Sequence, residues 1–182
     1  MGIHKNVKPR AVFLDRDGVI NRAIVRDGKP YPPADAEHTS ILPGVPEALA
    51  KLKIAGYVLV VVSNQPDVAR GKAERSVVEE INAKLARALP IDEFQTCFHD
   101  GPDGCACRKP RPGMLIDAAA KFDIDLPNSF MVGDRWRDTE AGKAAGCLTI
   151  FVDYGYEQDG PNRPDMIAQS LPHAVTLILA KP

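Results

Sequence analysis

Four short runs of hydrophobic residues, separated by longer segments of mixed polarity, set the pattern of this chain. They cover residues 11–14, 58–62, 129–132 and 148–152, and a weaker fifth candidate covers residues 94–98. The four runs are continuous and rich in β-branched residues, without a polar residue at every second position. That pattern is typical of strands in a parallel sheet that is buried on both faces.

The segments between these runs have the apolar spacing of helices. We predict helices over residues 45–55, 74–89, 114–122 and 139–145. The first places Val45, Leu49 and Leu52 on one side, and the last stops at Gly146, a typical helix C-cap. Alternating strands and helices indicate βαβ units. The expected fold class is therefore α/β, a Rossmann-like three-layer α/β/α arrangement around a mainly parallel sheet.

Two long loops interrupt the regular pattern, at residues 21–42 and 99–112. Loops of this length are usually functional or held by a metal. The first is too short to form a separate cap domain, so we expect residues 1–182 to form a single domain. Residues 170–179 are a candidate closing element.

Composition narrows the possible partners. The 182 residues are 45% hydrophobic and carry a formal net charge of −1 without a basic stripe, which argues against nucleic-acid binding. No apolar run is long enough to span a bilayer, and residues 1–8 lack the apolar stretch of a secretory signal. We expect a soluble, cytoplasmic monomer that acts on a small molecule, without membrane or nucleic-acid partners.

Polar residues stand where the apolar runs stop. Asp15 and Asp17 follow the first run, Ser63 and Asn64 the second, and Asp134 the third. Ligands of open α/β sheets bind outside the carboxyl ends of the strands, so these residues should meet in one crevice. If the ligand of this crevice is a phosphate, two carboxylates that face it need a cation between them, and Mg²⁺ prefers such oxygen ligands. Taken alone, the first two acids could equally well cap a turn.

Three of the four cysteines fall within eleven residues, together with a histidine. Cys97, His99, Cys105 and Cys107 form the order of ligands that suits a closed, structural Zn²⁺ site, in a loop at about residues 97–107. The alternative is a set of separate reduced cysteines with a surface histidine. Cys147 stands apart and is expected to be a buried, inert thiol.

Four motifs together resemble those of the haloacid dehalogenase superfamily, in the same order along the chain. They are Asp15-Arg16-Asp17-Gly18-Val19, Ser63-Asn64-Gln65, Arg108-Lys109-Pro110 and Gly133-Asp134-Arg135-Trp136-Arg137-Asp138. The resemblance spans about residues 11–153. Because of the cysteine and histidine cluster, it is closest to the branch that contains heptose bisphosphate and histidinol phosphate phosphatases.

The resemblance implies a Mg²⁺-dependent phosphatase that forms an aspartyl phosphate. Asp15 would be the nucleophile, and Asp17 would protonate the leaving alkoxide and then activate water. Ser63 and Lys109 would contact the transferring phosphoryl oxygens. The implied Mg²⁺ ligands are Asp15, Asp134 and the backbone carbonyl of Asp17, with Asp138 as a support behind them.

The resemblance also implies a small phosphorylated sugar as substrate. The most similar branch points to D-glycero-D-manno-heptose 1,7-bisphosphate, from which the 7-phosphate would be removed. The candidate substrate-binding residues are Asn64, Gln65, Arg108 and Arg135. Arg108 would meet a second anionic group. The alternatives are histidinol phosphate, another small sugar phosphate, or a zinc-stabilised binding module without activity.

Two departures from the branch pattern concern the substrate side of the site. Pro66 and Asp67 stand where a small residue and glycine are usual, and Arg135 stands where lysine is common. A guanidinium presents its charge to phosphate in a different geometry from an ammonium. Both differences affect the expected contacts with substrate more than the expected chemistry.

Overall fold

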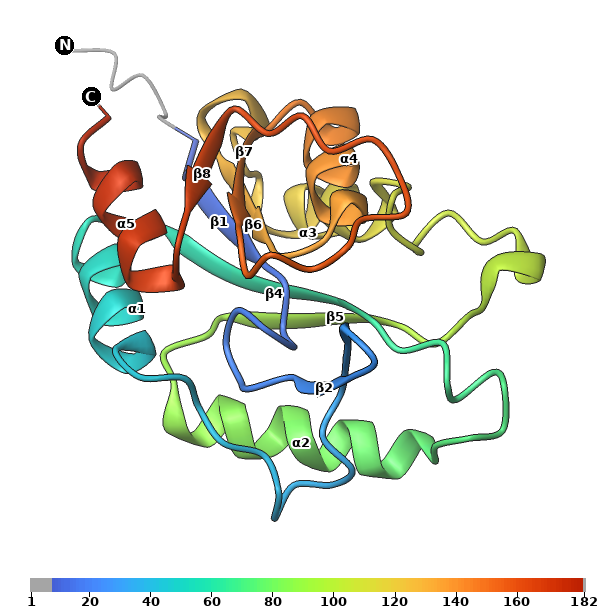
Figure 1. Ribbon diagram of the computed structural model, residues 1–182. Coiled ribbons are helices and arrows are strands. Elements are labelled where there is room, and N and C mark those ends of the chain that lie inside the picture. Colours follow the sequence, from blue (N-terminus) through green and yellow to red (C-terminus); the bar gives the residue numbers. More distant parts are fainter. Residues whose placement is uncertain (1–7, 182) are drawn as a thin grey trace, which may run out of the picture.

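A six-stranded parallel sheet forms the centre of the protein, seen in a computed structural model that describes residues 8–181 (Figure 1). Residues 1–7, which include most of the stretch examined for a secretory signal, lie outside the described residues. Every neighbouring pair of strands is parallel. In spatial order the strands are β5 (Glu93–Cys97), β4 (Val58–Asn64), β1 (Ala11–Leu14), β6 (Phe130–Gly133), β7 (Leu148–Val152) and β8 (Met166–Ala168).

Helices cover both faces of the sheet and complete the expected three layers. One face is covered by α1 (Val45–Ile54), α2 (Arg75–Ala88) and α5 (Leu171–Leu179), and the other by α3 (Gly113–Phe122) and α4 (Trp136–Ala145). The predicted Rossmann-like α/β/α fold is thus confirmed.

Strand β1 shows why the sequence gives this arrangement. Its side chains alternate between two separate cores: Val12 and Leu14 lie in the first, and Ala11 and Phe13 lie in the second. All four are fully buried. Because successive residues of a strand face opposite sides, only an uninterrupted apolar run can supply both cores.

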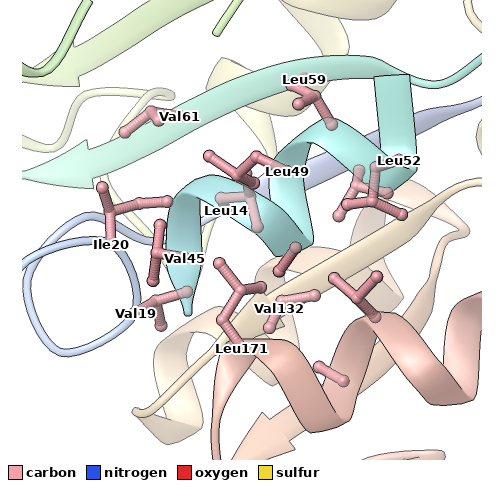
Figure 2. Close-up of a cluster of buried hydrophobic side chains, with 14 of the residues drawn as sticks. Leu14, Val19, Ile20, Val45, Leu49, Leu52, Leu59, Val61, Val132 and Leu171 are labelled. Atoms are coloured by element: carbon pink, nitrogen blue, oxygen red, sulfur yellow. The ribbon is translucent and has the colours of Figure 1, made fainter. Parts of the chain in front are cut away.

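The larger core lies between the sheet and the helices α1, α2 and α5. In Figure 2, Leu49 and Leu52 of α1 lie close to Leu14, Leu59 and the other labelled side chains that come from the strands. Helix α1 begins directly after Gly44, whose φ of 75° ends the preceding segment in a left-handed conformation. Its buried residues recur at helical spacing, which turns one side of the helix onto the sheet.

The order of the strands creates a crevice at the carboxyl end of β1. The chain first builds outward from β1 to β4 and β5, and it then continues on the other side with β6, β7 and β8. The crossovers therefore diverge beside β1, the point where ligands bind in open α/β sheets. The segments that follow β1, β4 and β6 all begin at this edge.

The structure differs from the predicted elements mainly at their ends. Helix α4 begins three residues earlier than predicted, and β4 continues to Asn64. The predicted loop at residues 21–42 contains an antiparallel hairpin of β2 (Ile24–Arg26) and β3 (Lys29–Tyr31). Strands β2, β3 and β8 have three residues each, too few for a clear periodic pattern.

Three features complete the described chain. The described residues also form two short 3₁₀ helices, η1 (Gly101–Asp103) and η2 (Leu126–Asn128). The segment between β1 and α1 holds the small hairpin and no separate cap domain, in line with the prediction. Among residues 8–181, no helix is both long and apolar enough to traverse a bilayer.

Candidate active site

Two carboxylates meet at the carboxyl ends of the adjacent strands β1 and β6. Asp15 follows β1 and Asp134 follows β6, and Leu14 pairs with Val132 in the sheet register. The backbone N–H of Asp15 donates to the carbonyl of Val132 at 2.9 Å. Carboxylate oxygens of Asp15, Asp134 and Asp138 all lie within 4.8 Å of one another. The convergence predicted from the strand ends is therefore present.

A buried lysine lies among these acids. The Nζ of Lys109 donates to Asp15 Oδ1 at 2.7 Å, to Asp138 Oδ1 at 2.6 Å and to the carbonyl of Val62 at 2.7 Å. Lys109 is 2% exposed. Burial alone would lower its pKa, but Asp138 and Asp15 outweigh burial and hold the pKa above its ordinary value. The site therefore contains a fixed positive charge directly beside Asp15.

Asp134 is the carboxylate without a partner. It is 1% exposed, and neither of its side-chain oxygens has a hydrogen-bond partner among the described residues. Burial raises its pKa well above the ordinary value, and burial likewise raises the pKa of Asp15 to about 7. An unpaired buried carboxylate lowers the stability of the folded protein by roughly several kcal/mol unless a cation offsets its charge. Asp15 and Asp134 thus have the donor chemistry that fits Mg²⁺.

Two glycines allow the segments of the site to approach so closely. Gly18 has a φ of 92°, and a Cβ there would lie 2.3 Å from Asp134 Oδ2. At Gly133 a Cβ would lie 2.2 Å from the Cβ of Asp138. Any larger residue at either position would force the acidic side chains apart. Gly18, which follows Asp15 and Asp17 in the sequence, is therefore required for the site as well as for the turn.

Asp17 lies beside this centre and is held by donors from three residues. Asp17 Oδ1 accepts from Arg16 Nε at 3.2 Å and from Asn21 Nδ2 at 2.9 Å. Asp17 Oδ2 accepts from an Arg16 guanidinium nitrogen at 3.0 Å and from Gln65 Nε2 at 2.8 Å. Its carboxylate is not in the group that could share an ion, which agrees with a role for its backbone carbonyl alone in metal binding.

The segment after β4 contributes Ser63, Asn64 and Gln65, each with a different set of contacts. Gln65 Nε2 donates to Ser63 Oγ at 2.8 Å as well as to Asp17. Asn64 accepts from the backbone N–H of Lys109 and donates to its carbonyl, both at 3.0 Å. Asn64 thus fixes the backbone that carries the buried lysine, and its predicted contact with substrate stays a prediction.

The crevice opens into a pocket of about 290 Å³ whose lining includes both acidic and basic side chains. Its lining contains every candidate catalytic, magnesium-binding and substrate-binding residue named from the sequence. Four arginines line it as well, namely Arg70, Arg108, Arg135 and Arg137. Tyr31 of β3 also lines the pocket, so the unpredicted hairpin borders the site. The pocket suits a small, strongly anionic molecule.

The cysteine and histidine cluster forms beside this pocket. Ligand atoms of Cys97, His99, Cys105 and Cys107 lie within 4.8 Å of one another, and all three cysteines are free thiols. His99 Nδ1 lies 3.3 Å from Cys107 Sγ and 3.6 Å from Cys97 Sγ. Three thiols and one imidazole at this spacing fit a tetrahedral Zn²⁺ site without an open position. The cluster immediately precedes Arg108 and Lys109.

Three arginines at the site were not predicted as functional residues from the sequence. Arg70 lines the pocket and donates twice to the carboxylate of Asp100, at 2.7 and 2.8 Å. Arg137, in the first turn of α4, also lines the pocket. Arg16 is completely buried behind Asp17. The sequence signal for Arg16 was its position between two acids at the end of a strand. The direction in which its side chain points depends on the fold.

Comparisons with known proteins agree with this geometry. The model of the HAD-hydrolase-like family matches residues 106–174. A D-glycero-β-D-manno-heptose-1,7-bisphosphate 7-phosphatase of Bordetella bronchiseptica is 38% identical over 151 residues, which are 80% of this chain and 82% of that protein. The enzyme of the same name from Escherichia coli K12 is 36% identical over 177 residues, covering 88% and 89% of the two chains.

A solved structure extends the similarity to nearly the whole fold. The D,D-heptose 1,7-bisphosphate phosphatase of B. bronchiseptica, crystallised with magnesium and phosphate, superposes with a TM-score of 0.77 at 31% identity. The match covers 95% of this chain and 99% of that one. The chain therefore belongs to the family of haloacid dehalogenase-like phosphatases that includes the heptose bisphosphate phosphatases.

Proposed function

We propose that this enzyme removes the 7-phosphate of D-glycero-β-D-manno-heptose 1,7-bisphosphate through an aspartyl phosphate on Asp15. The observation that carries the proposal is the position of Asp15. Its carboxylate lies beside the buried ammonium of Lys109 and within reach of one ion shared with Asp134. The names of the relatives support the choice of substrate.

The first chemical step transfers the phosphoryl group to the protein. A carboxylate oxygen of Asp15 attacks phosphorus, the bond to the sugar oxygen breaks, and Asp17 gives its proton to the departing alkoxide. Lys109 offsets the negative charge on the equatorial oxygens, and Ser63 donates its hydroxyl proton to one of them. Burial of Lys109 and Asp15 keeps this charge pair away from bulk water, which strengthens it.

The second step releases inorganic phosphate. Asp17, now a carboxylate, accepts a proton from water while the water oxygen attacks phosphorus, and the carboxylate of Asp15 leaves. The protein returns to its starting state once the phosphate departs and Asp17 regains a proton. One side chain thus acts first as acid and then as base.

Asp15, Asp134 and the backbone carbonyl of Asp17 are proposed to hold Mg²⁺. When bound, the ion supplies the positive charge that lets a phosphate approach these acids. Asp138 is proposed to act behind them, because Lys109 donates to its Oδ1 and the backbone N–H of Arg135 donates to its Oδ2. Both oxygens of Asp138 are therefore occupied by protein donors.

The arginines that line the pocket support a bisphosphate substrate. A monoester needs only the cations at Asp15, whereas four guanidinium groups also line the pocket. Planar guanidinium groups bind phosphate through paired hydrogen bonds. We assign Arg108 and Arg135 to the phosphate that is not cleaved, with Asn64 and Gln65 at the inner wall of the pocket.

The structural Zn²⁺ is proposed to keep the loop before Arg108 and Lys109 in place. Only loop residues and the short η1 connect Cys97 to α3, so cross-linking by a metal would stabilise this segment. The cytoplasmic location, the monomeric state and the single domain over residues 1–182 are further parts of the proposal.

A substrate panel with and without Mg²⁺ tests the proposed function. The panel contains the heptose 1,7-bisphosphate, the corresponding 7-phosphate and histidinol phosphate. We expect Mg²⁺-dependent release of one phosphate and the highest kcat/KM on the bisphosphate. Equal or better turnover of histidinol phosphate would overturn the substrate, and undiminished turnover by Asp15→Asn would overturn the chemistry.

A further inference from the structure

A completely buried arginine lies directly behind Asp17. Arg16 has 0% relative exposure, and it is the largest side chain among the described residues that are fully buried. Arginine is rarely buried to this extent unless its donors are satisfied, because stripping water from a guanidinium is costly. The phosphatase chemistry described above gives Arg16 no part, so its burial calls for an explanation.

The guanidinium of Arg16 fixes the carboxylate of Asp17 from one side. Its Nε and one terminal nitrogen donate to the two different oxygens of Asp17, at 3.2 and 3.0 Å. This paired contact sets the plane of the carboxylate as well as its distance. Asn21 and Gln65 donate to the same two oxygens, one to each. All four donors lie on protein groups, so the orientation of Asp17 is set before substrate arrives.

Arg16 is itself held from the helix layer. Its remaining terminal nitrogen donates to Asn82 Oδ1 of α2 at 2.9 Å. Asn82 in turn donates to Thr96 Oγ1 of β5 at 3.2 Å. The orientation of Asp17 is thus tied to α2 and β5 through a chain of side chains that does not touch the pocket lining beyond Asp17 itself.

We infer that Arg16 is a positioning residue for Asp17, anchored by Asn82, and that it orients the carboxyl group of Asp17 toward the oxygen of the leaving group. The inference rests on the proposed function, in which Asp17 is the general acid. It adds a residue whose role is orientation and which contacts neither substrate nor metal. A misplacement of about 1 Å in such a group can cost about 100-fold in rate.

The choice of leaving group separates positioning of an acid from general damage to the site. The 7-phosphate is an alkyl ester, and its leaving oxygen must be protonated as the bond to phosphorus breaks. The oxygen of p-nitrophenyl phosphate leaves as a stable phenolate and needs no proton. For both compounds, kcat/KM reports steps up to the first irreversible one, the transfer to Asp15. The ratio of the two kcat/KM values therefore measures how well the acid is placed.

The experiment compares this ratio in the wild type, Arg16→Met and Asn82→Ala, all with saturating Mg²⁺. For Arg16→Met we expect kcat/KM on the heptose bisphosphate to fall about 100-fold, with a change of less than about threefold on p-nitrophenyl phosphate. Asn82→Ala should shift the ratio in the same direction, by about 3–10-fold, because Arg16 remains but loses its anchor. Thermal unfolding confirms that each variant is folded.

Thr96→Val is the matched control. It removes the outermost hydrogen bond of the chain but leaves the Asn82 contact with Arg16, so the ratio should stay within about twofold of the wild type. Equal losses on both substrates, or an unchanged ratio in Asn82→Ala, would overturn the inference. The Asn82 variant alone decides the matter if Arg16→Met does not fold.

Asp17→Asn distinguishes failure of this inference from failure of the proposed function. If kcat/KM of that variant falls selectively on the alkyl ester while Asn82→Ala and Arg16→Met show no such selectivity, Asp17 is the acid and Arg16 does not position it. If kcat/KM of Asp17→Asn falls equally on both esters, the assignment of the acid itself fails.

Discussion

The Nζ of Lys109 lies 2.7 Å from Oδ1 of Asp15, although 94 positions separate the two residues in sequence. Lys109 also holds Asp138 and the end of β4, so one ammonium joins three segments of the site. Such an arrangement gives the proposed nucleophile a fixed cationic neighbour before substrate binds. It also makes this part of the core dependent on the charge of Lys109.

Replacing Lys109 by methionine should therefore affect both rate and stability. Loss of one donor to the transferring oxygens should lower kcat by about 100–1,000-fold. Loss of the buried charge leaves Asp15 and Asp138 unpaired, so the free energy of unfolding should fall by about 3–5 kcal/mol. Steady-state kinetics and urea denaturation check the two effects.

Lys121→Met provides the control for the lysine prediction. Lys121 pairs with Glu93 at 2.6 Å, but its side chain is 55% exposed. An exposed pair of this kind contributes only about 0–1 kcal/mol. A loss of stability in Lys109→Met no larger than in Lys121→Met would contradict the importance assigned to the buried charge.

Asp134→Asn should separate metal binding from folding. In protein without Mg²⁺ the buried, unpaired carboxylate is unfavourable, so the amide variant should be at least as stable as the wild type in Mg²⁺-free buffer. Added Mg²⁺ should raise the thermal midpoint of the wild type and leave that of the variant nearly unchanged. Calorimetric scans in Mg²⁺-free buffer and in Mg²⁺ test this, and an equal upward shift in both proteins would count against Asp134 as a ligand.

The cysteine cluster predicts a zinc content that depends on individual thiols. Protein purified without chelator should contain about one Zn²⁺ per chain, and Cys105→Ser should lose most of it. Cys147→Ser is a suitable control because Cys147 is buried and lies outside the cluster. Elemental analysis measures the zinc, and hydrogen exchange should show faster opening of residues 97–112 in Cys105→Ser. Retention of zinc by that variant is the contrary result.

Asp165, which contacts Thr149 near the start of β7, gives a pH-dependent prediction. Asp165 accepts from the backbone N–H and the hydroxyl of Thr149, at 2.8 and 2.7 Å. Burial raises its pKa, but the hydrogen bonds from Thr149 outweigh burial, so the pKa lies below its ordinary value. A depressed pKa in the folded state means that the carboxylate stabilises the fold above the unfolded-state pKa of about 4.

This contribution is lost as the pH falls through the lower pKa of the folded state. Asp165→Asn should therefore be less stable than the wild type at about pH 7, and the difference should shrink steadily below about pH 4. Urea denaturation of both proteins across this range measures the difference. A gap that stays constant with pH would show that the ionisation of Asp165 does not matter.

Much of the fold and of the candidate active site could be predicted because both depend on local sequence. The buried strands needed continuous apolar runs, and the acids followed those runs directly. Once the strands are parallel, Asp15 and Asp134 must lie at the same edge of the sheet. The prediction of a shared site for these residues therefore followed from the strand pattern, and the structure confirms their proximity.

The remainder depends on contacts that a one-dimensional pattern does not contain. The direction of Arg16 is set by Asn82 on a helix that begins 59 positions later, at Arg75. The hairpin that brings Tyr31 to the pocket consists of two three-residue strands, which have no clear periodicity. Asn64 forms hydrogen bonds with the backbone of Lys109 because the loops after β4 and β5 approach each other.

The aspartyl phosphate itself provides the most direct test of the account. Asp17→Asn should accumulate it, because transfer to Asp15 precedes the step that needs a base. The variant is mixed with p-nitrophenyl phosphate and Mg²⁺, quenched in acid, digested and analysed by mass spectrometry. We predict one phosphoryl group on the peptide that contains Asp15, removable by hydroxylamine. Continued turnover with no phosphorylated Asp15, or with the phosphoryl group on another residue, would contradict the account.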